Sequence, residues 1–579
     1  MSATGHPSSP HAGTRAFVVI GLLVAGSCAA AGAIRSYDFG WHLAAGESIL
    51  DAGGRPPRVD PLSHTPAGQD WVDHEWLFEA GLAGVVRHGG LVGAWLLKHG
   101  AAWLMVGVGA MWLLGRGVAP WLVALILAIA LEGARFRLAV RPELAGLALL
   151  PLLLFCLDRA RRARDETVIR WLAAVPVLVV AWVNLHPSAL LAVGLTAVFS
   201  AGVAVENRRD RRRTAAFLLC PVLAGVCLLA NPYGIDILRV PLRIHAALGI
   251  EGVSNPEWGS AVQRPFWMFW VIGLAGIGAA VHAIRGHRRL DWPMLMVGLT
   301  LGVGSGLALR LLGFFYVALP WVAASLLPPR ASSSRRPVVA ASVPVAAALF
   351  FLLLPRPLAA GVGPHLAPGR FPEAMAASFR NLSVRGPLYN PVRFGGYLSW
   401  RLHPERVFLD GRNELHAVLL ARVADCRRRV DVGCWDHLLD EWDVQAAIVE
   451  YDPRRLKDRL PDGRVVTRSA ASVWFRSSRW ALIDWDDTAM LYVRRSGANA
   501  PLVAAHEQHW LTPDDAGGFI DRLAEGRIDI AAAREEAHRQ AMAHPDSSRL
   551  AALTAILDGR LRRPRPRTRP DGDTERPPN

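Results

Sequence analysis

Long apolar runs separated by short, arginine-rich gaps constrain the fold of this chain more than any other feature of its sequence. A run of about 17–25 apolar residues is long enough to cross the hydrocarbon core of a bilayer. We therefore expect an all-α polytopic membrane domain over residues 16–356, with about eleven transmembrane helices. The predicted spans are residues 16–34, 91–114, 118–131, 143–157, 170–185, 188–205, 215–230, 266–284, 292–309, 311–327 and 338–355.

Every second gap between these spans is strongly basic, and this alternation predicts the orientation of the chain. Lys and Arg next to transmembrane helices stay on the cytoplasmic side of a membrane. Residues 1–15 are then cytoplasmic, whereas the long loops 35–90 and 231–265 and the region after residue 355 are extracytoplasmic. We expect the protein in the cell inner membrane. The basic gaps are residues 158–169, 206–214, 285–291 and 328–337.

The composition excludes an ordinary soluble enzyme and does not favour nucleic acid as a partner. Of the 579 residues, 52% are hydrophobic, and the net charge is +15. The basic residues gather at the membrane flanks and in an Arg/Pro-rich tail, where anionic lipid headgroups account for them. Membrane lipids are the expected partners, and no nucleic acid is expected.

Beyond residue 365 the sequence changes to that of a small α/β domain, predicted at 365–495 on the extracytoplasmic side. Short strand-like pieces alternate there with helical ones, which is typical of α/β modules. The predicted strands are 407–409, 446–449 and 490–493, and the predicted helices are 394–402, 414–428 and 435–442. A helical extension over 496–559 and a disordered tail over 560–579 complete the chain.

Two of the six cysteines, Cys426 and Cys434, lie in this predicted domain, eight residues apart. An oxidising compartment permits a disulfide between them. Two separate free thiols are the alternative, and the spacing does not decide between the two.

The first long loop carries the residues best suited to chemistry. Asp38 and His42 follow the first span, and Asp73, His74 and Glu75 come later in the loop. An acid at the membrane–water boundary is costly to desolvate, so it has a partner or a purpose. Asp38 and His42 are four residues apart and share one face if the segment is helical. The alternative interpretation is an interfacial helix with a capping aspartate and a belt of aromatic residues.

Several short motifs carry a resemblance to a known family. They are Asp38-Phe39-Gly40-Trp41-His42, the stretch from Trp71 to Trp76, Asn184-Leu185-His186, Asn231-Pro232-Tyr233-Gly234, Phe394-Gly395-Gly396-Tyr397 and Phe408-Leu409-Asp410-Gly411-Arg412. With these motifs the chain resembles the C-type membrane glycosyltransferase superfamily, and more closely a group of large bacterial multi-pass membrane proteins related to it. The likeness runs from about residue 16 to residue 495.

The resemblance implies transfer of a sugar from a polyprenyl-phosphate carrier to an envelope glycan, lipid or protein acceptor on the outer face of the membrane. Asp38 occupies the place of the family's catalytic acid, with His42, Asp73, His74 and Glu75 as helpers. A carboxylate there accepts the proton of the attacking hydroxyl or helps to hold a divalent cation, Mg or Mn. The family often has two neighbouring acids in this loop, whereas here Tyr37 and Phe39 flank Asp38. No metal-binding residues are assigned.

A lipid-phosphate donor also needs positive charge near the outer interface. Arg135, Arg137, Arg141 and Arg310 are the candidates, because arginine grips phosphate with a bidentate fork. The alternative is that these arginines reach lipid headgroups or pair with Glu132 and Glu143. Further candidates for substrate binding are Asn184, His186, Glu257 and Trp258. The alternatives are that Asn184 and His186 satisfy the polar groups of a helix hairpin, and that Glu257 and Trp258 form a structural aromatic anchor.

Two other functions fit the same sequence. One is a non-catalytic membrane protein that binds lipid-linked glycan or scaffolds an envelope-assembly complex. The other is a transporter, which is weakened by the scarcity of charged residues deep in the spans apart from Lys98 and His99.

Overall fold

The structure is a computed structural model that describes residues 10–65, 68–207, 209–253, 256–261, 266–286, 290–327, 361–459, 463 and 465–559, with side chains from residue 20 onward. Its contacts divide the chain into two compact units. The helical unit comprises Met1–Phe371 and Val392–Asp425, and the sheet unit comprises Pro372–Pro391 and Cys426–Asn579. The predicted span 338–355, the basic gap 328–337 and the tail 560–579 lie outside the described residues.

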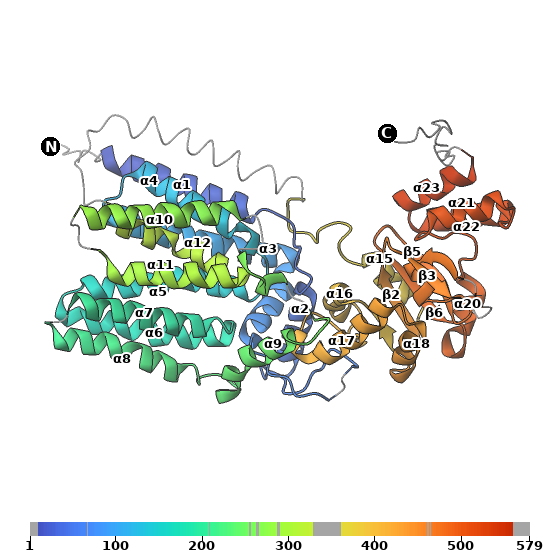
Figure 1. Cartoon of the computed structure of the whole chain (residues 1–579), viewed down its shortest axis with the longest axis horizontal. Coiled ribbons are helices and arrows are strands. Elements are labelled where there is room, and N and C mark those ends of the chain that lie inside the picture. The colour runs from blue at the N-terminus through green and yellow to red at the C-terminus, as the bar shows by residue number, and fades with distance from the viewer. Residues whose placement is uncertain are drawn as a thin grey trace, which may run out of the picture. The chain divides into compact units, whose positions relative to one another are not determined.

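The helical unit contains a helix at each of the first ten predicted spans, packed side by side (Figure 1). They are α1 (Pro10–Ala30), α3 (Trp76–Gly115), α4 (Pro120–Ala134), α5 (Glu143–Arg162), α6 (Asp165–Leu185), α7 (Ala189–Glu206), α8 (Arg211–Cys227), α10 (Trp267–Arg285), α11 (Trp292–Leu307) and α12 (Leu312–Leu326). Among the described residues, five stretches are long and apolar enough to cross a membrane: α3, α6, α7, α10 and Leu309–Leu326. The chain is thus a multi-pass membrane protein, while the count of eleven spans remains a prediction.

Large apolar side chains fill the interior of the bundle and also cover parts of its outside. Trp112 and Trp321 stack in the core with ring centroids 5.3 Å apart, and Trp182 and Phe199 are fully buried. Other apolar side chains point away from the protein, and Leu274 on α10 is 69% exposed. A helix that is apolar all round is suited to a surface that faces lipid.

Three of the basic gaps meet at one end of this bundle. Arg161 forms ion pairs with Glu206 at 2.8 Å and with Asp291 at 2.6 Å, which joins the gaps 158–169, 206–214 and 285–291. Arg213 donates to the carbonyl oxygens of Ala160 and Ala163, both at 3.0 Å. The Ala160 carbonyl also accepts from the N–H of Ala163, so the arginine adds a second donor at the end of helix α5.

Helix α3 begins earlier than the predicted span at residue 91. It starts at Trp76 and bends at Gly90, whose φ of 56° is outside the helical region. Beyond the bend, Trp95 Nε1 donates to the Ala31 carbonyl at 3.1 Å and Lys98 Nζ donates to the Gly32 carbonyl at 2.5 Å. Two side chains of α3 therefore bind the backbone just after the end of α1.

The opposite end of the helical unit is built around α2 (Phe39–Asp51), which packs against α3 and α16 (Val392–Arg401). Gly46 lies against the backbone of Glu79, and Gly40 lies against the backbone of Gly396. A side chain at either glycine would overlap those atoms. Helix α2 is consequently fixed to both neighbours at van der Waals distance.

The same packing explains why residues 392–425, predicted within the domain 365–495, group with the helical unit. This stretch contains α16 and most of α17 (Asn413–Arg429). The predicted strand Val407–Leu409 is wrong, because only Val407 takes part in a single bridge, with Ser63. Smaller elements at this end are η1 (Arg135–Arg137), η2 (Gly234–Arg239), α9 (Val240–Leu248), η3 (Pro256–Trp258) and η5 (Leu309–Leu311).

The sheet unit has a four-stranded mixed sheet in the order β1 (Leu388–Tyr389), β2 (Ala446–Glu450), β6 (Ala489–Arg494), β5 (Trp480–Trp485). Strand β1 is parallel to β2, and the other pairs are antiparallel. The strands predicted at 446–449 and 490–493 are confirmed as β2 and β6. The remaining elements are the hairpin β3 (Arg455–Arg459) and β4 (Val465–Ser469), with α15 (Glu373–Asn381), α18 (Val432–Glu441), α19 (Ala470–Trp474), η6 (Gly497–Asn499), α20 (Ala500–His506), α21 (Ala516–Ala524), α22 (Ile530–Ala543) and α23 (Ser548–Leu557).

A disulfide joins Cys426 and Cys434 in the sheet unit, with their Cα atoms 5.6 Å apart. It links the end of α17 to the first turn of α18. The spacing of eight residues had left the pairing open, and the structure resolves it in favour of the bond.

Candidate functional site

Asp38 stands immediately before α2, at the end of the helical unit where α2 packs. Its carboxylate accepts one hydrogen bond, from Trp41 Nε1 at 3.3 Å, and the side chain is half-buried. No Lys or Arg of the described part of the chain forms an ion pair with it. Burial raises the pKa of Asp38, and the more distant charge of Arg141 opposes that rise. Gly411 lies directly against the Asp38 carboxylate, where a side chain would overlap it.

Next to Asp38 lies a second group, the acid–histidine cluster, made of Asp73, Glu75, Glu79, His42, His74 and His186. His42 Nδ1 is 2.8 Å from Glu79 Oε1 and 3.7 Å from Glu75 Oε2. The other oxygen of Glu75, Oε1, is 3.5 Å from His186 Nε2 and 3.8 Å from His74 Nε2. Helix α2 supplies His42, the segment before α3 supplies Glu75, and the first turn of α3 supplies Glu79.

The acids of this cluster have no Lys or Arg partner among the described residues. Asp73, Glu75 and Glu79 are all buried, and no described Lys or Arg nitrogen lies within 4 Å of their carboxylates. Asp73 Oδ2 and Glu79 Oε2 are buried and have no hydrogen-bond donor among the described residues. Burial raises the pKa of Asp73 to about 6 and that of Glu75 well above its ordinary value. A cluster of this kind takes up protons or binds a cation.

Three of the four predicted phosphate-binding arginines are already paired with acids. Arg135 contacts Glu132 at 3.1 Å, and Arg137 forms a bidentate pair with Glu143. Arg141 contacts Glu257 at 2.7 Å and Glu143 at 3.1 Å. Burial alone would raise the pKa of Glu257, but Arg141 and Arg137 lower it to about 2. These contacts match the alternative in which the arginines balance neighbouring acids.

Arg310 differs from the other three. Its guanidinium lies 5.1 Å from the centre of the Trp258 ring, and within the described part of the chain it has no ion pair or hydrogen bond. Its charge acts on the pKa of Glu75 and of His186, which places it beside the acid–histidine cluster. Arg310 is thus the predicted arginine that has charge to offer an anionic ligand.

Asn184 and His186 contribute in different ways. Asn184 accepts from Trp76 Nε1 at 3.0 Å and donates to the carbonyls of Val180 and Ala230, both at 2.8 Å, so its amide group joins three segments. His186 Nδ1 bonds to Ser188 Oγ at 2.7 Å, which leaves Nε2 facing Glu75. Asn184 holds the structure together, whereas His186 faces the cluster.

The internal ion pair expected within Asp410-Gly411-Arg412 is present, whereas sequence reasoning missed Glu79 and the pairing of Asp60 with Arg412. Arg412 donates to Asp60 at 2.6 Å and to Asp410 at 2.6 Å, and all three side chains are buried. The guanidinium also lies 4.7 Å from the Trp71 ring centre. The signal for Glu79 was its spacing from Glu75, because residues four apart share one helix face. Asp60 has no such local signal.

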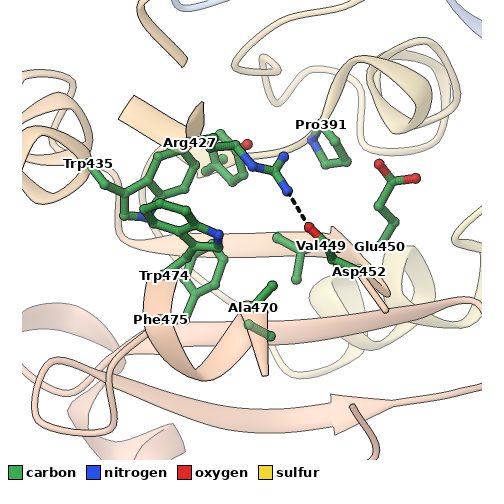
Figure 2. A pocket seen from close by; sticks show the side chains of 11 residues that line it. Pro391, Arg427, Trp435, Val449, Glu450, Asp452, Ala470, Trp474 and Phe475 are labelled. Atoms are coloured by element: carbon green, nitrogen blue, oxygen red, sulfur yellow. Dashed lines mark hydrogen bonds and ion pairs between the residues drawn. The ribbon is translucent and has the colours of Figure 1, made fainter. Parts of the chain in front are cut away.

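The sheet unit contains a separate cavity of about 370 Å³, counting its open mouth (Figure 2). Trp435, Trp474 and Phe475 form one side, and Arg427 on the other side pairs with Asp452 at 3.1 Å. The three aromatic rings are at most 5% exposed, so they offer no open face on which a sugar could stack. No predicted site residue lines this cavity.

Comparisons with known proteins support the fold. Against solved structures, the chain is similar to ArnT from Cupriavidus metallidurans in the apo state, with a TM-score of 0.52, 13% identity, and coverage of 84% of this chain and 98% of that chain. ArnT bound to undecaprenyl phosphate gives a TM-score of 0.49, 12% identity, and coverage of 84% and 98%. The oligosaccharyltransferase AglB from Archaeoglobus fulgidus, in complex with an inhibitory peptide and a dolichol-phosphate, gives a TM-score of 0.49 and 8% identity. That match covers 90% of this chain and 83% of that chain.

No family model matches the sequence, and no curated protein matches it. At these identities the structural likeness shows the fold alone. The fold implied by the resemblance, that of the C-type membrane glycosyltransferases, is confirmed.

Proposed function

We propose that this protein transfers a sugar from a polyprenyl-phosphate donor to an envelope glycan, lipid or protein acceptor at the outer face of the inner membrane. The shared fold supports a membrane glycosyltransferase that uses a lipid-linked donor. Asp38 is the proposed catalytic base, and its environment is the observation that carries the proposal.

The Asp38 carboxylate has the properties that a general base needs. It is half-buried, holds a single hydrogen bond, and forms no ion pair with described residues, so its charge is available to a substrate. Burial raises its pKa, which brings its basicity closer to the pH at which the reaction would run. The absence of a side chain at Gly411 leaves room for the carboxylate.

The proposed step is a displacement at the anomeric carbon of the donor sugar. The acceptor hydroxyl oxygen forms a bond to that carbon while the bond from the carbon to the phosphate oxygen breaks. The electron pair of the broken bond leaves with the polyprenyl phosphate, and the hydroxyl proton passes to Asp38. A positioned base of this type contributes about 10²- to 10⁴-fold to a rate.

Arg310 is the proposed contact for the donor phosphate. Its guanidinium is free of carboxylate partners in the described chain and is held over Trp258. Binding of phosphate there would offset the negative charge that grows on the leaving group. Arg137 and Arg141, which already share Glu143 and Glu257, would set the local potential instead of binding the phosphate directly.

Replacement of Asp38 by Asn tests this function. We expect Asp38→Asn to lower glycosyl transfer by about 10²- to 10⁴-fold while the protein still inserts and folds. The readout is mass spectrometry of envelope glycans from a deletion strain complemented with each variant. Asp51→Asn is the matched control, because Asp51 ends the same helix and is exposed. Glycans that stay unchanged with Asp38→Asn would favour the non-catalytic alternative.

A further inference from the structure

We propose that the cavity of the sheet unit binds the acetamido group of an N-acetylated sugar. Such a group is neutral and brings a carbonyl oxygen and a methyl group. The cavity lies wholly within the sheet unit, with its two tryptophans and Arg427 on facing sides (Figure 2). Binding requires only the residues of this cavity, whereas the role of the sugar as part of the acceptor glycan rests on the proposed transfer reaction.

Side-chain nitrogens of the residues that line the cavity lack hydrogen-bond acceptors. Nε1 of Trp435, Nε1 of Trp474 and Nε of Arg427 are buried and have no hydrogen-bond partner among the described residues. Both tryptophans are at most 3% exposed, so bulk water does not reach them easily. An indole or guanidinium N–H donates and cannot accept. A buried donor without an acceptor is costly, so a ligand suited to this cavity supplies an acceptor oxygen.

The charges around the cavity favour a neutral acceptor over an anion. Arg427 already contacts Asp452 at 3.1 Å, and Glu450 lines the same cavity. A hydrogen bond from Arg454 at 2.8 Å lowers the pKa of Asp452, which keeps that carboxylate charged. A carboxylate or phosphate ligand would thus meet one paired arginine and two acids. A carbonyl oxygen accepts from the N–H donors without this repulsion.

The remaining wall of the cavity suits a methyl group. Val449, Ala470, Ala471 and Phe475 line it with small or apolar surfaces. The cavity measures about 370 Å³ with its open mouth, and its aromatic rings are almost fully covered, so it admits a short group and not a whole sugar ring. An acetamido group places its methyl against the apolar wall and its carbonyl near the donors, while the sugar ring stays at the mouth. A hydroxyl group would supply the acceptor without the methyl contact.

Ligand-observed NMR of the full-length protein in detergent is the first test. In saturation-transfer difference spectra, N-acetylglucosamine should bind, and its acetyl methyl protons should receive more saturation than its ring protons. Glucose lacks the acetamido group and acetate adds a charge, so each should give a several-fold weaker signal. Equal signals for N-acetylglucosamine and glucose would leave the donors to water and overturn the proposal. Acetate binding more tightly than N-acetylglucosamine would also overturn it.

Trp474→Phe tests the donor, because it removes the indole N–H and keeps an aromatic ring. The signal of N-acetylglucosamine should fall several-fold. Trp485→Phe is the matched control, since Trp485 is fully buried in the same unit, its Nε1 also lacks a partner among the described residues, and it does not line the cavity. The two variants should lose similar amounts of Tm. An unchanged signal in a folded Trp474→Phe protein would contradict the proposal, and if that variant unfolds, the comparison of ligands on the wild-type protein decides.

Asp38→Asn separates this site from the proposed transferase. Asp38 lies in the helical unit and does not line the cavity, so the variant should bind N-acetylglucosamine as the wild-type protein does while transfer falls. Wild-type protein that transfers sugar but does not bind N-acetylglucosamine would refute the cavity alone. Binding that persists in a protein without transfer activity would refute the transferase alone.

Discussion

Two groups of buried acids lie at the same end of the helical unit, and the chain neutralises them differently. In one group, Arg412 lies between Asp60 and Asp410 and donates to both at 2.6 Å. In the other, Glu75 and Glu79 face His42, and no described Lys or Arg comes within 4 Å. Both groups draw on the first long loop, and both are buried.

The difference shows which of the two groups of buried acids already has its counter-charge from the chain. A buried acid whose cation comes from the same chain needs nothing further, and removal of that cation leaves a buried charge without a partner. A buried acid without a cation remains open to a ligand. Burial of an acid in this loop therefore does not by itself mark a site, and the missing counter-charge is the better indicator.

Two arginines at this end of the helical unit differ in the same way, one having carboxylate partners and the other having none among the described residues. Arg412 has two carboxylate partners, whereas Arg310 has Trp258 as its neighbour and no carboxylate among the described residues. The first should support stability, and the second should support binding. Substitution of each arginine by the same residue tests this separation.

The largest effect is expected from Arg412→Met. The substitution leaves Asp60 and Asp410 buried without their cation, which costs about 3–5 kcal/mol. Thermal unfolding of the protein in detergent should show a large loss of Tm. Arg406→Met in the same segment is the control, because Arg406 is exposed and its removal should cost little. An unchanged Tm for Arg412→Met would show that the network is not structural.

A smaller effect is expected from Arg310→Met. Loss of one charge-assisted contact should raise the KM for a polyprenyl-phosphate donor about tenfold, which corresponds to about 1.4 kcal/mol. The Tm should change little, in contrast to Arg412→Met. Arg243→Ala, at an exposed position of α9, serves as the control for loss of positive charge. A large loss of Tm with an unchanged KM would assign Arg310 to structure.

The smallest effect is a shift in the pH profile of transfer. Asp38 must be ionised to accept a proton, so transfer should fall as the pH drops through its pKa, which burial raises above the ordinary value. Arg141 opposes that rise, so Arg141→Gln should move the acid limb to higher pH. Arg135→Gln should not, because Arg135 pairs with Glu132 instead. An acid limb that stays in place would mean that another group controls it.

The helices could be predicted well from the sequence, because an apolar run long enough to cross a bilayer has few other uses. The start of α3 could not be predicted, because Glu79 and Arg87 lower the hydropathy of the stretch Trp76–Gly90. The strand predicted at Val407–Leu409 failed for a related reason. Three apolar residues suit a buried loop as well as a strand, and here they are buried with a single bridge to Ser63.

The candidate site could be predicted only in part. Asp38, His42, Asp73, His74 and Glu75 in the first loop were found because their motifs are local. The pairing of Asp60 with Arg412 joins residues 352 positions apart, and no spacing rule reaches that far. The pairing of Arg141 with Glu257 is also distant, so sequence reasoning assigned both to substrate binding, a role that remains a prediction.

The hydrogen bond from Lys98 of α3 to the Gly32 carbonyl, just after α1, bears on the transporter alternative. Lys98 and His99 were the charged groups deep in the spans that could have served proton or ion translocation. Lys98 Nζ ends on the Gly32 carbonyl, and His99 Nδ1 lies 2.9 Å from the Trp95 carbonyl. A proton-conducting wire requires each titratable group to pass its proton to another. Backbone oxygens have no proton to exchange, so these contacts do not form a proton relay. The Lys98 contact instead links α3 to the segment that follows α1.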